Sequence, residues 1–138
     1  MQQESITGIL SVILAAIGGF AIGAVWYMTF SKPWAAAAGL SLDENGRPVG
    51  GGSVVPFVIA FAASLLMAGM LRHVFAMAGI DTAAKGLVSG VGLGLFILAP
   101  WISMNYAYSM RPRNLTLIDG GYAILGPAIV GLILGALS

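Results

Sequence analysis

Residues 6–30 of the chain, ITGILSVILAAIGGFAIGAVWYMTF, contain no charged side chain, and this stretch decides the fold class. A helix rises 1.5 Å per residue, so these residues are long enough to cross the roughly 30 Å hydrocarbon core of a bilayer. The apolar run is continuous rather than alternating, and it exceeds the core of a secretory signal. We therefore expect a transmembrane helix that is retained in the mature protein.

Three further apolar segments follow, over about 54–77, 83–104 and 115–137 of the 138 residues. Four spans cannot close a β-barrel, because such a barrel needs at least about eight strands. Short connections between helices make neighbouring helices antiparallel. We predict an all-α fold, a four-helix transmembrane bundle with antiparallel neighbours, forming a single integral membrane domain over residues 1–138.

The composition agrees with a membrane protein and excludes several function classes. The chain is 59% hydrophobic and 8% charged, whereas soluble domains are about 25% charged. Its few cations are scattered, which argues against nucleic acid as a partner. It has no cysteine and a single histidine, and no Ser/His/acid set or carboxylate pair is evident. We therefore expect no cofactor, no metal site and no enzymatic activity.

The basic residues near the span ends predict an orientation, because cytoplasmic loops carry an excess of Lys and Arg. The loops after the first and third spans carry four such residues, and the opposite side carries two. We expect the four-residue side to be cytoplasmic and both termini to lie outside. The first loop should also contain a short interfacial helix over residues 34–40, begun by Pro33. The two sets are Lys32, Arg47, Arg111 and Arg113, and Arg72 and Lys85.

Two aromatic motifs mark the predicted cytoplasmic side. Residues 23–27, GAVWY, end the first span, and Arg111-Pro112 leads to residues 117–122, LIDGGY, in the fourth. With these motifs nearly the whole chain resembles a family of small bacterial four-helix membrane proteins of unknown function. The resemblance implies the bacterial inner membrane and assigns no activity, substrate or cofactor. The family pattern often places a histidine where this chain has Ala123, so no role of that histidine carries over.

Asp119 is an ionisable residue inside the fourth span, and such residues are functional hypotheses by default. One interpretation is that it pairs with Arg111 or Arg113 near the helix N-terminus, where a carboxylate is favoured. The other is a small polar pocket at the cytoplasmic face that binds a head group, an ion or a small solute. The pocket would consist of Trp26, Tyr27, Asn105, Tyr106, Arg111, Asp119 and Tyr122.

Small residues recur at four-residue spacing in every span, and such rows let helix backbones approach closely in lipid. They predict either packing within the chain or an interface between copies. The candidate packing residues are Gly19, Gly23, Gly86, Gly90, Gly94, Gly131 and Gly135. On the side of the termini, Arg72 and His73 are expected to reach the interface and to pair with Asp81.

The leading functional hypothesis is a non-enzymatic protein that acts by association, as a homo-oligomer or as an accessory subunit of a larger membrane complex. Its partners would be membrane lipids and a membrane protein. The alternative is a small-solute or ion transporter or channel subunit whose pathway passes Asn105 and Asp119. A lipid-modifying enzyme ranks last, because no reactive set of side chains is visible.

Overall fold

The computed structural model describes residues 2–138, and it describes their side-chain environments from residue 5 onward. This part of the chain is 80% helix and contains no strand, which confirms the all-α prediction. Four helices are long and apolar enough to cross a membrane. The elements are α1 (Gln2–Thr29), α2 (Ser31–Ala38), α3 (Val55–Ala78), α4 (Ala83–Leu93), the π-helical turn η1 (Gly94–Leu98), α5 (Ala99–Tyr108) and α6 (Arg113–Ala136).

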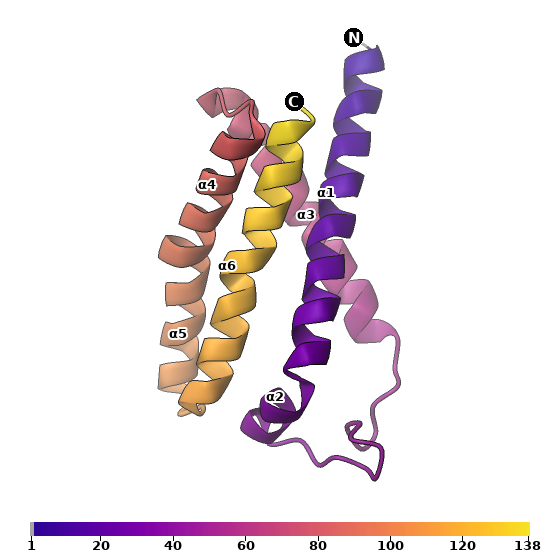
Figure 1. The fold of residues 1–138 in the computed structure, drawn as a ribbon, viewed down its shortest axis with the longest axis vertical. Coiled ribbons are helices and arrows are strands. Elements are labelled where there is room, and N and C mark those ends of the chain that lie inside the picture. The colour runs from indigo at the N-terminus through magenta and orange to yellow at the C-terminus, as the bar shows by residue number, and fades with distance from the viewer. Residues whose placement is uncertain (1) are drawn as a thin grey trace.

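Helix α6 is the centre of the arrangement and contacts every other helix (Figure 1). Helix α1 lies along one side of it, and α4, η1 and α5 together run along the other side as one continuous helix. Helix α3 lies behind and packs on α1 and α6. Half of the apolar segment of α6 is buried inside the bundle, compared with 17% of the apolar segment of α3 and 11% of that of the α4–α5 helix. The bundle is therefore built around its last helix in chain order.

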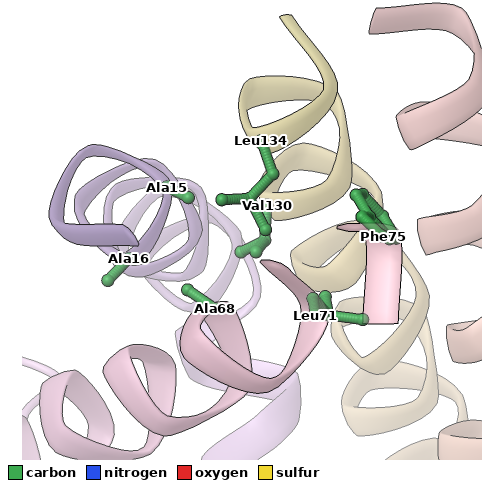
Figure 2. Close-up of a cluster of buried hydrophobic side chains, with 7 residues drawn as sticks. All are labelled: Ala15, Ala16, Ala68, Leu71, Phe75, Val130 and Leu134. Atoms are coloured by element: carbon green, nitrogen blue, oxygen red, sulfur yellow. The ribbon is translucent and has the colours of Figure 1, made fainter. Parts of the chain in front are cut away.

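A core of small and branched side chains fills the space where α1, α3 and α6 meet (Figure 2). Ala15 and Val130 are completely buried, and Phe75 is 4% exposed. The alanines keep α1 close to its neighbours, while the larger side chains come from α3 and α6. The cluster consists of Ala15, Ala16, Ala68, Leu71, Phe75, Val130 and Leu134.

Glycines bring α4 and α6 into backbone contact. A Cβ atom on Gly86 would overlap the carbonyl group of Gly131, and one on Gly90 would overlap that of Pro127. Gly94 faces the carbonyl oxygen of Ala123, which the helix leaves without its usual donor because Pro127 has no N–H. Small residues at this interface therefore permit the close approach that lipid-embedded helices use for cohesion.

The remaining glycine candidates also face neighbouring helices of the same chain. Gly19 lies against Val130, Gly23 lies against Tyr122, and Gly135 lies against the backbone of Thr82. All seven predicted packing glycines are thus used inside the molecule. An interface between two copies of the chain would therefore have to form on a surface other than these glycine faces.

Two helix boundaries differ from the sequence-based expectation. The third long helix continues to Tyr108 rather than ending at residue 104, so Asn105 and Tyr106 lie in a helix and not in a loop. Hydropathy falls at residue 104, but backbone hydrogen bonds carry the helix on through polar and aromatic interfacial residues. The short helix covers Ser31–Ala38 instead of residues 34–40, with Pro33 in its first turn and Gly39 as a left-handed C-cap.

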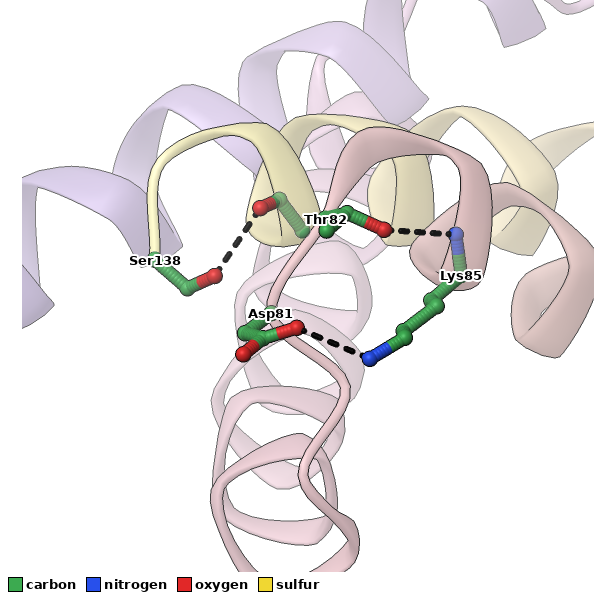
Figure 3. A network of polar contacts seen from close by, with 5 residues as sticks. Asp81, Thr82, Lys85 and Ser138 are labelled. Atoms are coloured by element: carbon green, nitrogen blue, oxygen red, sulfur yellow. Dashed lines mark hydrogen bonds and ion pairs between the residues drawn. The ribbon is translucent and has the colours of Figure 1, made fainter.

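The turn between α3 and α4 corrects the expected pairing of Asp81 (Figure 3). Its carboxylate pairs with Lys85 at 3.1 Å, not with Arg72 or His73. The hydroxyl of Thr82 accepts the backbone N–H of Lys85 and caps α4. Asp81 directly precedes the N-cap of α4 and lies four residues before Lys85, so its carboxylate pairs with the first turn of α4 rather than with the end of α3.

Candidate functional site

The carboxylate of Asp119 is the focus of the polar end of the bundle. Its Oδ1 accepts hydrogen bonds from the hydroxyl of Tyr27 at 2.6 Å and from Nε1 of Trp34 at 3.0 Å. Its Oδ2 accepts the hydroxyl of Tyr106 at 2.5 Å. These donors come from α1, α2 and α5, so one side chain of α6 joins three other helices. We call Asp119, Tyr27, Trp34 and Tyr106 the carboxylate cluster.

The two aromatic motifs interlock across α1 and α6, and this places the cluster. The ring of Trp26 lies 2.5 Å from where a Cβ of Gly121 would stand, and its Nε1 donates to the carbonyl of Ile118 at 2.9 Å. In the reverse direction Tyr122 lies over Gly23 and donates its hydroxyl to the carbonyl of Gly19 at 2.7 Å. Each helix thus offers a glycine to an aromatic side chain of the other.

Aromatic contacts hold the donors in position. The ring of Tyr27 meets that of Trp34 edge-on at 5.9 Å and that of Tyr122 edge-on at 5.5 Å. Edge-to-face pairs at such distances are favourable, because the positive ring edge meets the negative face. Asp119 and its donors are all partly buried, so the hydrogen bonds form away from bulk water. The carboxylate cluster therefore connects α1, α2 and α5 to α6 at this end of the bundle.

The interpretation that Asp119 pairs with an arginine is wrong. Arg111 donates from Nη2 to the carbonyl of Ala38 at 3.1 Å, at the C-terminal end of α2. A cation is favoured there, because the last carbonyls of a helix carry partial negative charge. Within residues 5–138 the one ion pair is that between Asp81 and Lys85. Arg111 therefore helps to hold α2 while leaving the carboxylate to neutral donors.

The predicted polar pocket is assembled only in part. Asn105 is exposed on α5 and its side chain makes no hydrogen bond within the described residues, so it stands apart from the other candidates. Trp34 was missing from the predicted set, although the Lys32-Pro33-Trp34 sequence at the aromatic end offered a signal. Three of the roughly four acceptor positions of the carboxylate are occupied. Neither of the two cavities described below includes Asp119.

Four apolar helices of membrane-spanning length, latched at one end through a single carboxylate, define a small all-helical protein whose composition suits a membrane. The chain belongs to the family described as "Protein of unknown function (DUF1761)", whose model matches residues 10–135. No curated protein and no solved structure matches the sequence.

The indole of Trp34 gives a direct test of how α2 is held. Trp34→Phe removes the N–H that Asp119 accepts while keeping an aromatic ring. We expect proteinase K to cleave residues 31–54 about tenfold faster in detergent micelles, because a hydrogen bond to a charged group holds a local unit closed by about that factor. Val88→Ala, at an exposed position on α4, is the control. Equal cleavage rates for both variants and the wild type would show that the indole does not hold α2.

Proposed function

We propose that the protein is a multi-pass protein of the bacterial cytoplasmic membrane that acts by association, as a homo-oligomer or an accessory subunit, without chemistry of its own. The four apolar helices support the membrane setting. The excess of Lys and Arg in the loops after the first and third spans supports outward termini.

The state of Asp119 supports an assembly role over a transport role. Its carboxylate oxygens are engaged by Tyr27, Trp34 and Tyr106, and these contacts fix α1, α2 and α5 on α6. A pathway would need a carboxylate that faces an open, hydrated space. No observation favours the second hypothesis, a solute or ion pathway through this end of the bundle.

The observation that carries the association proposal is a polar and aromatic stripe on the outer face of η1 and α5. Phe96, Trp101 and Tyr108 are 75%, 64% and 85% exposed, and Asn105 lies between the last two. The π-helical turn η1, in which the N–H of Ala99 bonds the carbonyl of Gly94, begins this exposed face. We call these four residues the outer stripe.

The chemistry of the outer stripe suits a helix of another molecule. Tyr and Trp are enriched among the residues that dominate binding energy at protein interfaces. An amide in a membrane helix associates with a partner by hydrogen bonding across the contact, and Asn105 has no such partner within the described residues. Helix α5 has α6 as its one neighbouring long helix, so the stripe is accessible from outside.

Substitution of Asn105 tests this surface. We expect the wild-type protein in mild detergent to contain more than one copy, or a stoichiometric foreign subunit, by native mass spectrometry. Asn105→Leu should weaken that association at least about fivefold, because interhelical side-chain hydrogen bonds contribute roughly 1–2 kcal/mol.

Val88→Ala is the matched control, since Val88 is 71% exposed on α4 away from the stripe. It should leave the assembly unchanged. A wild-type particle of one copy without a partner would contradict the proposal. An assembly that Asn105→Leu leaves intact would exclude the stripe as its interface.

A further inference from the structure

A groove between α1 and α3 lies at the end of the bundle opposite the carboxylate cluster. It encloses about 550 Å³. Ser5, Arg72 and His73 form its polar part, and its apolar part includes Val12 and Leu65. Arg72 also lines a neighbouring cavity of about 730 Å³ bounded by α1, α3 and the end of α6. Arg72 therefore lines both the groove and the neighbouring cavity.

The guanidinium of Arg72 lies against a glycine of α1. The position of a Cβ on Gly8 would be 2.5 Å from Cζ of Arg72, so the guanidinium packs directly on the backbone of α1. Arg72 comes six residues before Ala78, the end of α3, which places it about 9 Å inside the helix. Gly8 lies at a similar depth from the start of α1. Arg72 is exposed, so its guanidinium is accessible at the surface of this helical segment.

Among the side chains that the structure describes, no carboxylate pairs with the guanidinium of Arg72. No carboxylate of residues 5–138 lies within ion-pair distance of Arg72, and Asp81, which lines the neighbouring cavity, pairs with Lys85. The groove itself has two basic residues, Arg72 and His73, and no acidic one. A cation inside a span is costly unless an anion compensates it, so the lining formed by residues 5–138 favours an anion beside Arg72.

We propose that this groove binds an anionic phospholipid, with the phosphodiester on Arg72 and one acyl chain along the apolar part. A guanidinium presents a planar fork of donors that matches two phosphate oxygens, and His73 adds a further donor beside it. Ile9, Val12 and Leu65 continue the groove away from Arg72 and His73. The proposal is independent of association through the outer stripe.

The shape of the groove favours a lipid over a free phosphate ion. Beyond Arg72 and His73 the lining is apolar. An apolar lining gives a free phosphate ion no hydrogen-bond donor, but it can contact a hydrocarbon chain. Gly69 widens this part, because nothing lies within 4 Å of the position its Cβ would take. A larger side chain at Gly69 would fill the groove without a clash with the helix backbone, so it separates the effect of shape from that of charge.

The experiment is native mass spectrometry of the detergent-extracted full chain titrated with phosphatidylglycerol or phosphatidylcholine. The wild type should retain one phosphatidylglycerol in preference to phosphatidylcholine. Arg72→Gln should weaken that binding about tenfold or more, the factor expected for losing a hydrogen-bonded charge. Gly69→Leu should weaken it similarly while leaving Arg72 in place. Millimolar inorganic phosphate should not displace the lipid.

Arg47→Gln is the control, because it removes one positive charge from an exposed residue of the first loop that lines neither space. It should bind phosphatidylglycerol as the wild type does. The proposal is overturned if Arg72→Gln and Gly69→Leu both bind like the wild type, or if Arg47→Gln loses as much affinity as Arg72→Gln. It is also overturned if the two lipids bind equally or if phosphate displaces the lipid. Far-UV circular dichroism checks that each variant remains helical, and Gly69→Leu decides the question if Arg72→Gln does not fold.

Discussion

Asp119→Ala is expected to lower the free energy of unfolding by about 3–5 kcal/mol, because three hydrogen bonds to one carboxylate are lost. The substitution leaves the hydroxyls of Tyr27 and Tyr106 and the indole N–H of Trp34 without their acceptor. Each hydrogen bond to a charged group contributes roughly 1.5–3 kcal/mol, and the three share one carboxylate. Unfolding in increasing mole fractions of dodecyl sulfate, followed by far-UV circular dichroism, measures the loss.

Asp43→Ala is the control for this experiment. Asp43 lies in the exposed first loop, where its carboxylate accepts only the backbone N–H groups of Asn45 and Arg47, each at 2.9 Å. We expect a change below about 1 kcal/mol there, because the turn is surface-exposed. Asp119→Asn should fall between the two, since it keeps one acceptor oxygen. If Asp119→Ala were as stable as Asp43→Ala, the carboxylate cluster would not hold the bundle.

Gly90→Leu is expected to destabilise the protein by about 3 kcal/mol, the upper end of the usual cost of overpacking. The first atom of the new side chain would overlap the carbonyl group of Pro127 and approach Cα of Ala128, at 2.9 Å. These are backbone atoms, and they cannot move aside as a flexible side chain can. The two helices would have to separate along their whole glycine contact, and the same dodecyl sulfate titration would record the loss.

Gly92→Leu provides a control two residues away on the same helix. No atom lies within 4 Å of the position of a Cβ on Gly92, so the leucine meets open space. It also removes a glycine from a helix interior, which by itself stabilises by up to about 1 kcal/mol. Equal stability of the two variants would mean that α4 and α6 do not meet at Gly90.

The helices and the glycine contacts were accessible from the sequence for different reasons. Apolar length alone identifies a span, because a bilayer of fixed thickness demands it. Four-residue spacing identifies a face that permits close approach, as with Gly86 and Gly90 on α4. Spacing does not identify the helix that occupies the face. The choice between packing within the chain and packing between copies therefore needed the structure.

The carboxylate cluster was predicted in part, and the missing parts have a common cause. Tyr27 and Tyr106 were expected near Asp119. Trp34 also donates to Asp119 but was not expected there, because the two residues lie 85 positions apart in sequence. Its position depends on how the short helix α2 folds back under α6, which no local pattern encodes. One of the two interpretations paired Asp119 with Arg111 or Arg113, which are close in sequence, but Arg111 donates to the carbonyl of Ala38 instead.

The central position of α6 has a consequence for biosynthesis. A chain emerges from the ribosome N-terminal end first, at roughly 5–20 residues per second, so α1, α3 and the α4–α5 helix are synthesised before α6 exists. During that interval α1 and α3 can already pack on each other, whereas the glycine face of α4 has no partner, because α6 supplies it. The α4–α5 helix must therefore wait for α6. Under the proposed membrane placement, assembly of this bundle is completed late, and truncation before residue 113 would leave the α4–α5 helix without the helix on which it packs.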